Sequence, residues 1–269
     1  MKYEVIDVSV NGSIGKAKLS TYVISHSESI MIDKRPMVVI CPGGGYNHVS
    51  EREGEMIALS FLAMGYHAAV LHYSVAPAVY PTQLLELAKA MCYVRKHTKE
   101  WHVDEKKIFV QGSSAGGHLA ASLGCFWKRK LFDEITGGDS ELIRPDGMIL
   151  SYPVITSGKY AHRDSFVKLL ADRYEELVDE MSLEKQVNSD TPKTFLWHTF
   201  EDGTVPVENT LLFAQALREK EIPFECHIYP KGRHGLALGN ELTSSDGEKE
   251  IQPEVTNWIQ MAGTFIKNF

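Results

Sequence analysis

The sequence predicts an α/β fold with a mostly parallel sheet covered by helices on both faces. Short, continuously apolar segments alternate along the chain with longer segments whose apolar residues recur at helical spacing. Strands buried on both faces are apolar throughout, whereas a surface helix carries its apolar residues on one stripe. Regular alternation of the two patterns favours parallel strands joined by crossover helices. A chain of 269 residues fits one large domain of this kind or two small ones, and we expect a single domain over residues 1–269.

Six short apolar runs are the predicted core strands. They are Met37–Cys41, Ala68–Leu71, Ile108–Val110, Met148–Leu150, Thr194–Trp197 and Cys226–Tyr229. The N-terminal segment Tyr3–Val10 alternates instead, which predicts an antiparallel edge strand.

Helix boundaries are indicated by proline and by one capping pattern. Pro81, Pro206 and Pro253 each stand where a helix is expected to begin. Ser50 and Glu53 have the spacing of a capping box, in which the serine caps the helix and the glutamate bonds back to it. A helix is therefore expected to start at Ser50.

The region from about 156 to about 190 interrupts the alternation of strands and helices. It is highly charged, and the strand pattern resumes only at Thr194. We expect a small helical insertion there, lying over the carboxyl edge of the sheet like a cap. An ordinary crossover helix with long loops is the alternative.

Composition and charge exclude several classes of function. The chain has 28 basic and 35 acidic residues, a net charge of −7, and no basic cluster that would bind phosphates, so nucleic acid is not an expected partner. No run approaches the 18 or so apolar residues of a membrane span, and the N-terminus lacks the pattern of a signal peptide. We expect a cytoplasmic protein with no membrane partner.

The four cysteines do not have the spacing of a metal or redox site. Cys41, Cys92, Cys125 and Cys226 form no C-x-x-C pair, and each lies within or beside an apolar run. Reduced, mostly buried thiols are expected rather than a disulfide framework or a zinc site. We predict neither a metal nor an organic cofactor.

A candidate nucleophile lies in a glycine-rich turn between a predicted strand and a predicted helix. Gly112-Ser-Ser114-Ala-Gly116 matches the pattern G-x-S-x-G, with Ser114 at its centre. A sharp turn of this kind exposes the serine hydroxyl, and glycines relieve the crowding between strand and helix. Ser113 lacks glycines at the required offsets. A turn without chemistry, or an anion site at the helix N-terminus, would be the alternatives.

A second glycine run, Gly43–Gly45, follows the first core strand. Attack on an ester carbonyl creates an oxyanion, and backbone N–H groups directed at that oxygen are often the largest catalytic contribution. We assign Gly44, Gly45 and Ala115 as the donors, although the choice among the glycines is uncertain by one position. A plain flexible turn is the alternative. Tyr46 and His48, next in the chain, are candidate pocket residues.

The candidate acid and base follow two later strands. In hydrolases built on such a sheet the nucleophile precedes the acid, and the acid precedes the histidine. Asp202 follows the predicted strand that ends at Trp197, and His234 follows the one that ends at Tyr229. Both should therefore lie at the carboxyl edge, where open α/β sheets keep their sites. Asp202 would orient His234, the general base.

Other residues of the same types compete for these two roles. Glu201 and Asp246 are alternative acids that would serve the same purpose. His118, His198 and His227 lie in predicted helix or strand positions, so we expect them to pack rather than to react.

Four motifs together resemble those of a known family. They are Pro42-Gly-Gly-Gly-Tyr46, Gly112-Ser-Ser-Ala-Gly-Gly-His-Leu-Ala120, Trp197-His-Thr-Phe-Glu-Asp202-Gly-Thr-Val-Pro-Val-Glu-Asn209 and Gly232-Arg-His-Gly-Leu236. The chain from about Pro36 onward resembles the acetylesterase and acetyl-xylan-esterase-like branch of the α/β-hydrolases, which is related to feruloyl-esterase-like and hormone-sensitive-lipase-like groups. The resemblance implies the α/β-hydrolase fold, the triad and short acyl groups, including acetyl groups on sugars. Pro42 stands where the lipase-like relatives carry histidine, so that histidine's contacts do not carry over.

The expected activity is hydrolysis of short-acyl esters by a serine esterase with a small-molecule substrate. Amide or peptide hydrolysis with the same triad is an alternative. A ligand-binding protein on a retired hydrolase scaffold is another, although such a protein would typically have lost a triad residue. The sequence leaves homo-oligomer formation open.

Overall fold

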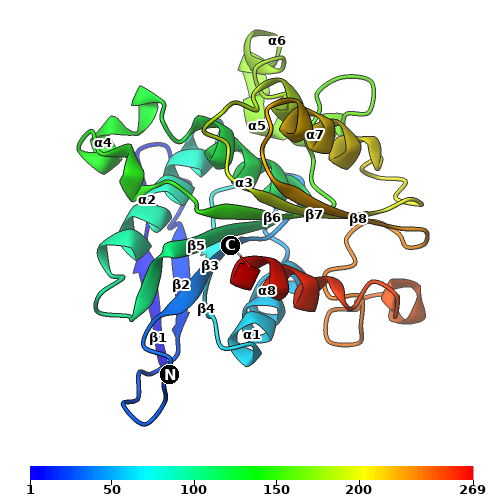
Figure 1. Cartoon of the computed structure of the whole chain (residues 1–269). Coiled ribbons are helices and arrows are strands. Elements are labelled where there is room, and N and C mark those ends of the chain that lie inside the picture. Colours follow the sequence, from blue (N-terminus) through cyan, green and yellow to red (C-terminus); the bar gives the residue numbers. More distant parts are fainter. Residues whose placement is uncertain (269) are drawn as a thin grey trace.

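The computed structural model describes residues 1–268 and confirms the predicted α/β architecture (Figure 1). Within these residues eight strands form one sheet in the order β1-β2-β4-β3-β5-β6-β7-β8. The strands are β1 Lys2–Asp7, β2 Lys18–Val23, β3 Arg35–Cys41, β4 His67–His72, β5 Val103–Ser113, β6 Gly147–Ser151, β7 Thr194–Thr199 and β8 Phe224–Tyr229. All six predicted core strands are confirmed as β3 to β8.

Strands β3 to β8 pair in parallel, and the first two strands pair antiparallel at one edge. The predicted antiparallel edge strand is confirmed as β1. Sequence reasoning missed β2, because this strand lacks a continuous apolar run. Its Ser20 and Thr21 are nevertheless buried between the neighbouring strands.

Helices cover both faces of the sheet. They are α1 Glu55–Ala63, α2 Thr82–Lys96, α3 Ala115–Phe126, α4 Asp133–Thr136, α5 Arg163–Leu170, α6 Tyr174–Leu177, α7 Glu208–Glu219 and α8 Trp258–Asn268. Helices α1 and α8 lie on one face, and α2, α3 and α7 lie on the other (Figure 1). Each face has its own buried apolar cluster, so the sheet is enclosed as its continuous apolar strands require.

The predicted capping box at Ser50 is wrong. Ser50 makes no side-chain capping bond, a short 3₁₀ turn occupies Glu51–Glu53, and α1 begins only at Glu55. The Glu53 carboxylate is buried and accepts hydrogen bonds from Gly43 N–H at 2.8 Å and from the Tyr152 hydroxyl at 2.6 Å. Glu53 therefore bonds to residues distant in sequence instead of forming the predicted capping bond with Ser50.

The region 156–190 is helical, as expected. It lies between β6 and β7 and contains α5, α6 and the 3₁₀ turn Leu183–Lys185. Phe166, Leu169 and Leu170 of α5 belong to the same apolar cluster as Leu119 of α3, so the insertion packs directly on the main core.

Among the described helices, none combines the length and the apolar character that a membrane crossing requires.

Candidate active site

The turn between β5 and α3 holds Ser114 in a conformation that few side chains adopt. Its φ is 54° and its ψ is −120°, and β5 ends one residue before it while α3 begins one residue after it. A Cβ on Gly112 would lie 2.1 Å from the carbonyl oxygen of Gly116, and one on Gly116 would lie 2.0 Å from that of Cys41. Both glycines are therefore required for the close contact between strand and helix that directs the Ser114 hydroxyl toward His234.

Three predicted residues from three different loops lie in hydrogen-bond contact. Ser114 Oγ is 2.8 Å from Nε2 of His234, and Nδ1 of His234 is 2.6 Å from Oδ2 of Asp202. A carboxylate accepts, so we assign the imidazole proton to Nδ1, which leaves Nε2 to accept from the serine hydroxyl. The parallel strands β5, β7 and β8 create this meeting point, because their carboxyl ends share one edge of the sheet.

Asp202 is held on all sides by donors. Its Oδ1 accepts from the backbone N–H groups of Thr204 and Val205, both at 2.9 Å, and His198 Nε2 lies 3.2 Å from Oδ2. Burial raises the pKa of Asp202, but hydrogen bonds from His198 and His234 outweigh it, so the pKa lies below its usual value. The acid is therefore ionised at neutral pH.

The competing residues have other partners. Glu201 accepts a hydrogen bond from Gly232 N–H at 3.3 Å, and Asp246 pairs with Arg233 at 2.8 Å. Ser113 is fully buried and accepts from the side chain of Gln111 at 3.1 Å. Within residues 1–268, none of these three residues forms a hydrogen bond or an ion pair with His234.

The glycine run lies beside Ser114 and presents backbone donors. Gly43 N–H is already used by the Glu53 carboxylate. The N–H groups of Gly44, Gly45 and Ala115 have no acceptor among the described residues. The Gly44 carbonyl accepts from the two backbone N–H groups at 47 and 48, which curls the loop into a tight turn.

A cleft of about 600 Å³ opens over Ser114 and His234. His48 lines it from the glycine loop, and the insertion forms another wall with His162, Asp164 and Lys168. Burial and then the charge of His234 lower the pKa of His162. Sequence reasoning missed these wall residues, and the only signal for them was the charged character of the insertion.

Tyr46 does not line the cleft, contrary to expectation. Its side chain is buried, and its hydroxyl lies 2.9 Å from Nδ1 of His118. A positive φ of 58° turns the residue inward, toward the core. The other nitrogen of His118 lies 3.0 Å from the carbonyl oxygen of Met181, and burial lowers the pKa of this histidine to about 4.

His118 and His198 are buried, as predicted, whereas His227 is partly exposed and lies 2.7 Å from the carboxylate of Glu225. His198 also touches the site. His198 is fully buried and lies 2.8 Å from the Thr210 hydroxyl through Nδ1. Its Nε2 lies 2.9 Å from the Val205 carbonyl oxygen and 3.2 Å from Oδ2 of Asp202, so one N–H is shared between the two acceptors. This contact was missed. The four-residue spacing between His198 and Asp202 across the end of β7 is the signal that would have indicated it.

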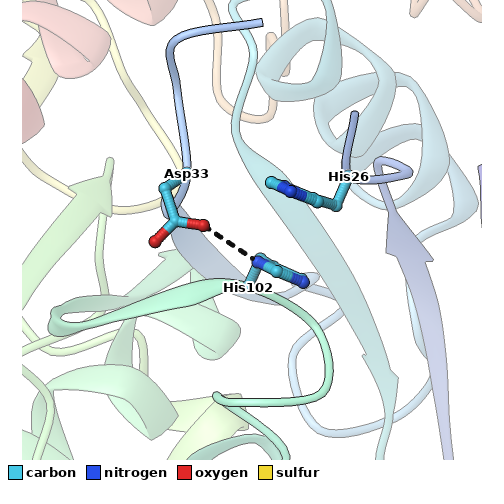
Figure 2. A group of neighbouring side chains, drawn as sticks. All are labelled: His26, Asp33 and His102. Atoms are coloured by element: carbon cyan, nitrogen blue, oxygen red, sulfur yellow. Dashed lines mark hydrogen bonds and ion pairs between the residues drawn. The ribbon is translucent and has the colours of Figure 1, made fainter. Parts of the chain in front are cut away.

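One group of possible metal ligands lies elsewhere in the described part of the chain (Figure 2). His102 Nδ1 lies 3.3 Å from Asp33, and the ring of His26 stacks on that of His102 with centroids 3.9 Å apart and planes 1° apart. An imidazole lone pair lies in the ring plane, so one ion cannot bind two stacked parallel rings. The arrangement is thus a hydrogen-bonded pair with a ring stack, at the opposite end of β5 from Ser114.

The four cysteines are free, and Cys41, Cys92 and Cys125 are buried, as predicted.

The fold and the serine turn define the chain as an α/β-hydrolase. It belongs to the BD-FAE family, whose model matches residues 26–217. Among curated proteins it is 42% identical over 217 residues to endo-1,4-beta-xylanase B of Butyrivibrio fibrisolvens, covering 77% of this chain and 33% of the relative. It is 25% identical over 230 residues to an acetylxylan esterase of Xylanibacter ruminicola, covering 83% of this chain and 45% of that protein. The chain thus spans between a third and about half of the length of these two curated relatives.

Solved structures resemble the whole chain. The acetyl ester-xyloside bifunctional hydrolase from Caldicellulosiruptor lactoaceticus superposes with a TM-score of 0.84 at 35% identity, covering 98% of this chain and 96% of that one. The carboxylesterase Cest-2923 from Lactobacillus plantarum WCFS1 superposes with a TM-score of 0.85 at 25% identity, covering 100% and 98%. These comparisons confirm the resemblance to acetylesterase-like α/β-hydrolases.

Proposed function

We propose that this protein is a serine esterase that hydrolyses short-acyl carboxylic esters, with acetylated sugars or xylo-oligosaccharides as its substrates. The observation that carries the proposal is the hydrogen-bonded series Ser114–His234–Asp202 at the floor of an open cleft. The names of two relatives, an acetylxylan esterase and an acetyl ester-xyloside hydrolase, support the substrate class.

Acylation begins with proton transfer from the nucleophile. His234 Nε2 takes the proton of Ser114 as Oγ attacks the ester carbonyl, and ionised Asp202 stabilises the imidazolium that forms. The N–H groups of Gly44, Gly45 and Ala115 donate to the oxyanion. Loss of one such donor costs roughly 3 kcal/mol of transition-state stabilisation. His234 then protonates the departing alkoxide.

Deacylation uses the same groups in reverse order. His234 takes a proton from a water molecule, and the resulting hydroxide attacks the acyl-Ser114 carbonyl. The second oxyanion is held by the same backbone donors. Its collapse releases the carboxylic acid and returns the proton to Ser114. The proposed steps use only residues of this chain and water.

The chemistry of the cleft favours a polar alcohol such as a sugar. Apart from glycines, its lining residues carry polar or charged side chains, among them Asn47, His48 and Asp164. Such groups can bond sugar hydroxyls, whereas a long acyl chain needs an apolar lining to be removed from water.

A series of p-nitrophenyl esters from acetate to decanoate tests the acyl preference. We expect hydrolysis to fall steeply beyond acetate or butyrate, and acetate to be released from acetylated xylo-oligosaccharides but not from a chemically deacetylated control. Rates that rise with chain length would contradict the proposal. Comparison of an ester with its matched amide tests the peptidase alternative, and tight sugar binding without turnover would favour a non-catalytic role.

The cytoplasmic location and homo-oligomer formation stay predictions.

A further inference from the structure

Glu53 is a buried acid beside the nucleophile that the proposed reaction does not use. Only 4% of the residue is exposed. Its Oε2 accepts a hydrogen bond from Gly43 N–H at 2.8 Å, and its Oε1 accepts one from the Tyr152 hydroxyl at 2.6 Å. A Cβ on Gly43 would lie 2.6 Å from Glu53 Oε2 and 2.9 Å from the Cβ of Ser114. The carboxylate therefore holds the glycine loop at the point where that loop touches the nucleophile.

Tyr152 links the same carboxylate to the histidine loop. Its hydroxyl oxygen accepts from Ala237 N–H at 2.9 Å, so the one hydroxyl proton is donated to Glu53. Its ring packs edge-on against the imidazole of His234, with centroids 5.1 Å apart. Tyr152 adopts a φ of 37°, a strained value for a side chain that is not glycine.

These contacts form one continuous series of hydrogen bonds. Ala237 N–H donates to the Tyr152 hydroxyl, which donates to Oε1 of Glu53, and Gly43 N–H donates to the other carboxylate oxygen, Oε2. Each donor in the series has one acceptor, and each Glu53 oxygen has one donor. The series therefore joins the loop that follows His234 to the loop that carries the candidate oxyanion donors.

Arg52 contacts the histidine loop from outside. Its guanidinium donates to the carbonyl oxygen of Gly235 at 3.0 Å and to that of Thr243 at 2.5 Å. It also lies 2.9 Å from the buried carboxylate of Glu250. The turn Glu51–Glu53 thus contacts the histidine loop through one side chain and the glycine loop through the next.

We propose that Glu53 and Tyr152 act together as a positioning pair that aligns the oxyanion donors and His234 on the same carbonyl. The inference rests on the proposed esterase chemistry. A displacement of about 1 Å in an active site can cost roughly a hundredfold in rate, so separating the two loops lowers kcat. KM should change less, because the cleft wall formed by His162, Asp164 and Lys168 belongs to the insertion and not to either loop. Neither residue reacts with the substrate.

Three variants test the pair: Glu53→Gln, Tyr152→Phe and the double variant. Glutamine is isosteric but directs an amide N–H₂ at one of the two donors. Phenylalanine keeps the ring against His234 and removes both hydroxyl bonds. With p-nitrophenyl acetate, and per active site titrated by a fluorophosphonate, we expect kcat to fall roughly 30-fold for Glu53→Gln and about tenfold for Tyr152→Phe, with KM changed less than about threefold. The kcat of the double variant should lie within about twofold of that of Glu53→Gln. Both substitutions break the same series of hydrogen bonds, so the second one has little left to disrupt.

Glu86→Gln is the matched control. Glu86 is also fully buried and accepts hydrogen bonds from Ser13 and Ser74, outside the cleft. It should lower Tm without changing kcat per titrated site. If Glu53→Gln behaves like Glu86→Gln, or if the single effects multiply in the double variant, the positioning role is overturned. Tyr152→Phe carries the test alone if Glu53→Gln does not fold. Wild-type protein that is not labelled at Ser114 would instead contradict the proposed function itself.

Discussion

His198 Nε2 lies 3.2 Å from Oδ2 of Asp202, the same oxygen that lies 2.6 Å from His234 Nδ1. The other oxygen of Asp202 is occupied by two backbone donors. The carboxylate therefore has little freedom to rotate. Its orientation toward His234 is fixed by His198 and by the backbone N–H groups of Thr204 and Val205.

Asp202→Asn should leave the fold intact and lower kcat about 10⁴-fold, the loss seen for the equivalent change in a serine protease. An amide in this position favours the wrong tautomer of His234. The readout is kcat on p-nitrophenyl acetate together with Tm. Glu201→Gln on the same loop is the control and should stay within twofold of wild type. Equal losses in the two variants would refute the assignment of the acid.

His198→Phe should lower kcat about tenfold, because Asp202 loses one donor but keeps His234 and two backbone N–H groups. Steady-state kinetics on the same ester measure this. His227→Phe, on the neighbouring strand β8, should leave kcat unchanged. A His198→Phe enzyme with wild-type kcat would show that the contact with Asp202 has no catalytic effect.

Gly44→Ala should lower kcat by more than about a hundredfold, because it displaces the N–H groups of Gly44 and Gly45, two of the three proposed oxyanion donors. Gly44 has a φ of 123°, and its added Cβ would lie 2.1 Å from the carbonyl oxygen of His48. Gly137→Ala serves as the control, because Gly137 has a φ of 65° with open space around it. That variant should lose roughly 1 kcal/mol of stability and no kcat. Full activity in Gly44→Ala would contradict the role of this loop.

Stability should fall as the pH drops from about 6.5 to about 4. Burial lowers the pKa of both His118 and His67 from 6.5 to about 4, so the unfolded chain binds more protons than the folded one across this window. The contribution of these histidines to the free energy of unfolding is fully present above about pH 6.5 and is lost as the pH falls toward about 4. We expect Tm to decline less steeply with falling pH in His118→Gln than in wild type. Parallel Tm curves would show that His118 does not contribute.

The fold was predictable wherever burial leaves a pattern in the sequence. Ile108–Val110 identified β5 from its apolar part, but the strand begins at Val103, which pairs with Arg35 of β3. The register between β3 and β5 is irregular between this pair and the next one, Met37 with Ile108, so the charged residues 104–107 carry no apolar pattern that would reveal the start of the strand. Strand β2 escaped detection because Ser20 and Thr21 are buried by strand neighbours rather than by an apolar pattern.

The site was predictable where chemistry constrains spacing. Ser114 stands in a turn that demands glycines, and the chain order indicated Asp202 and His234, which the fold brings into contact. Glu53 and Tyr46 were misread, because backbone conformation and partners distant in sequence decide where their side chains point. Neither the backbone conformation nor these distant partners can be inferred from the neighbouring sequence.

The most direct test of the account is hydrolysis of p-nitrophenyl acetate by wild type, Ser114→Ala and Ser113→Ala, with folding checked by circular dichroism. The two serines are adjacent and both are buried, but only Ser114 contacts His234 within the described chain. The account predicts that Ser114→Ala loses at least about 10³-fold in kcat, while Ser113→Ala stays within a few-fold of wild type. Near-normal turnover by folded Ser114→Ala would contradict it.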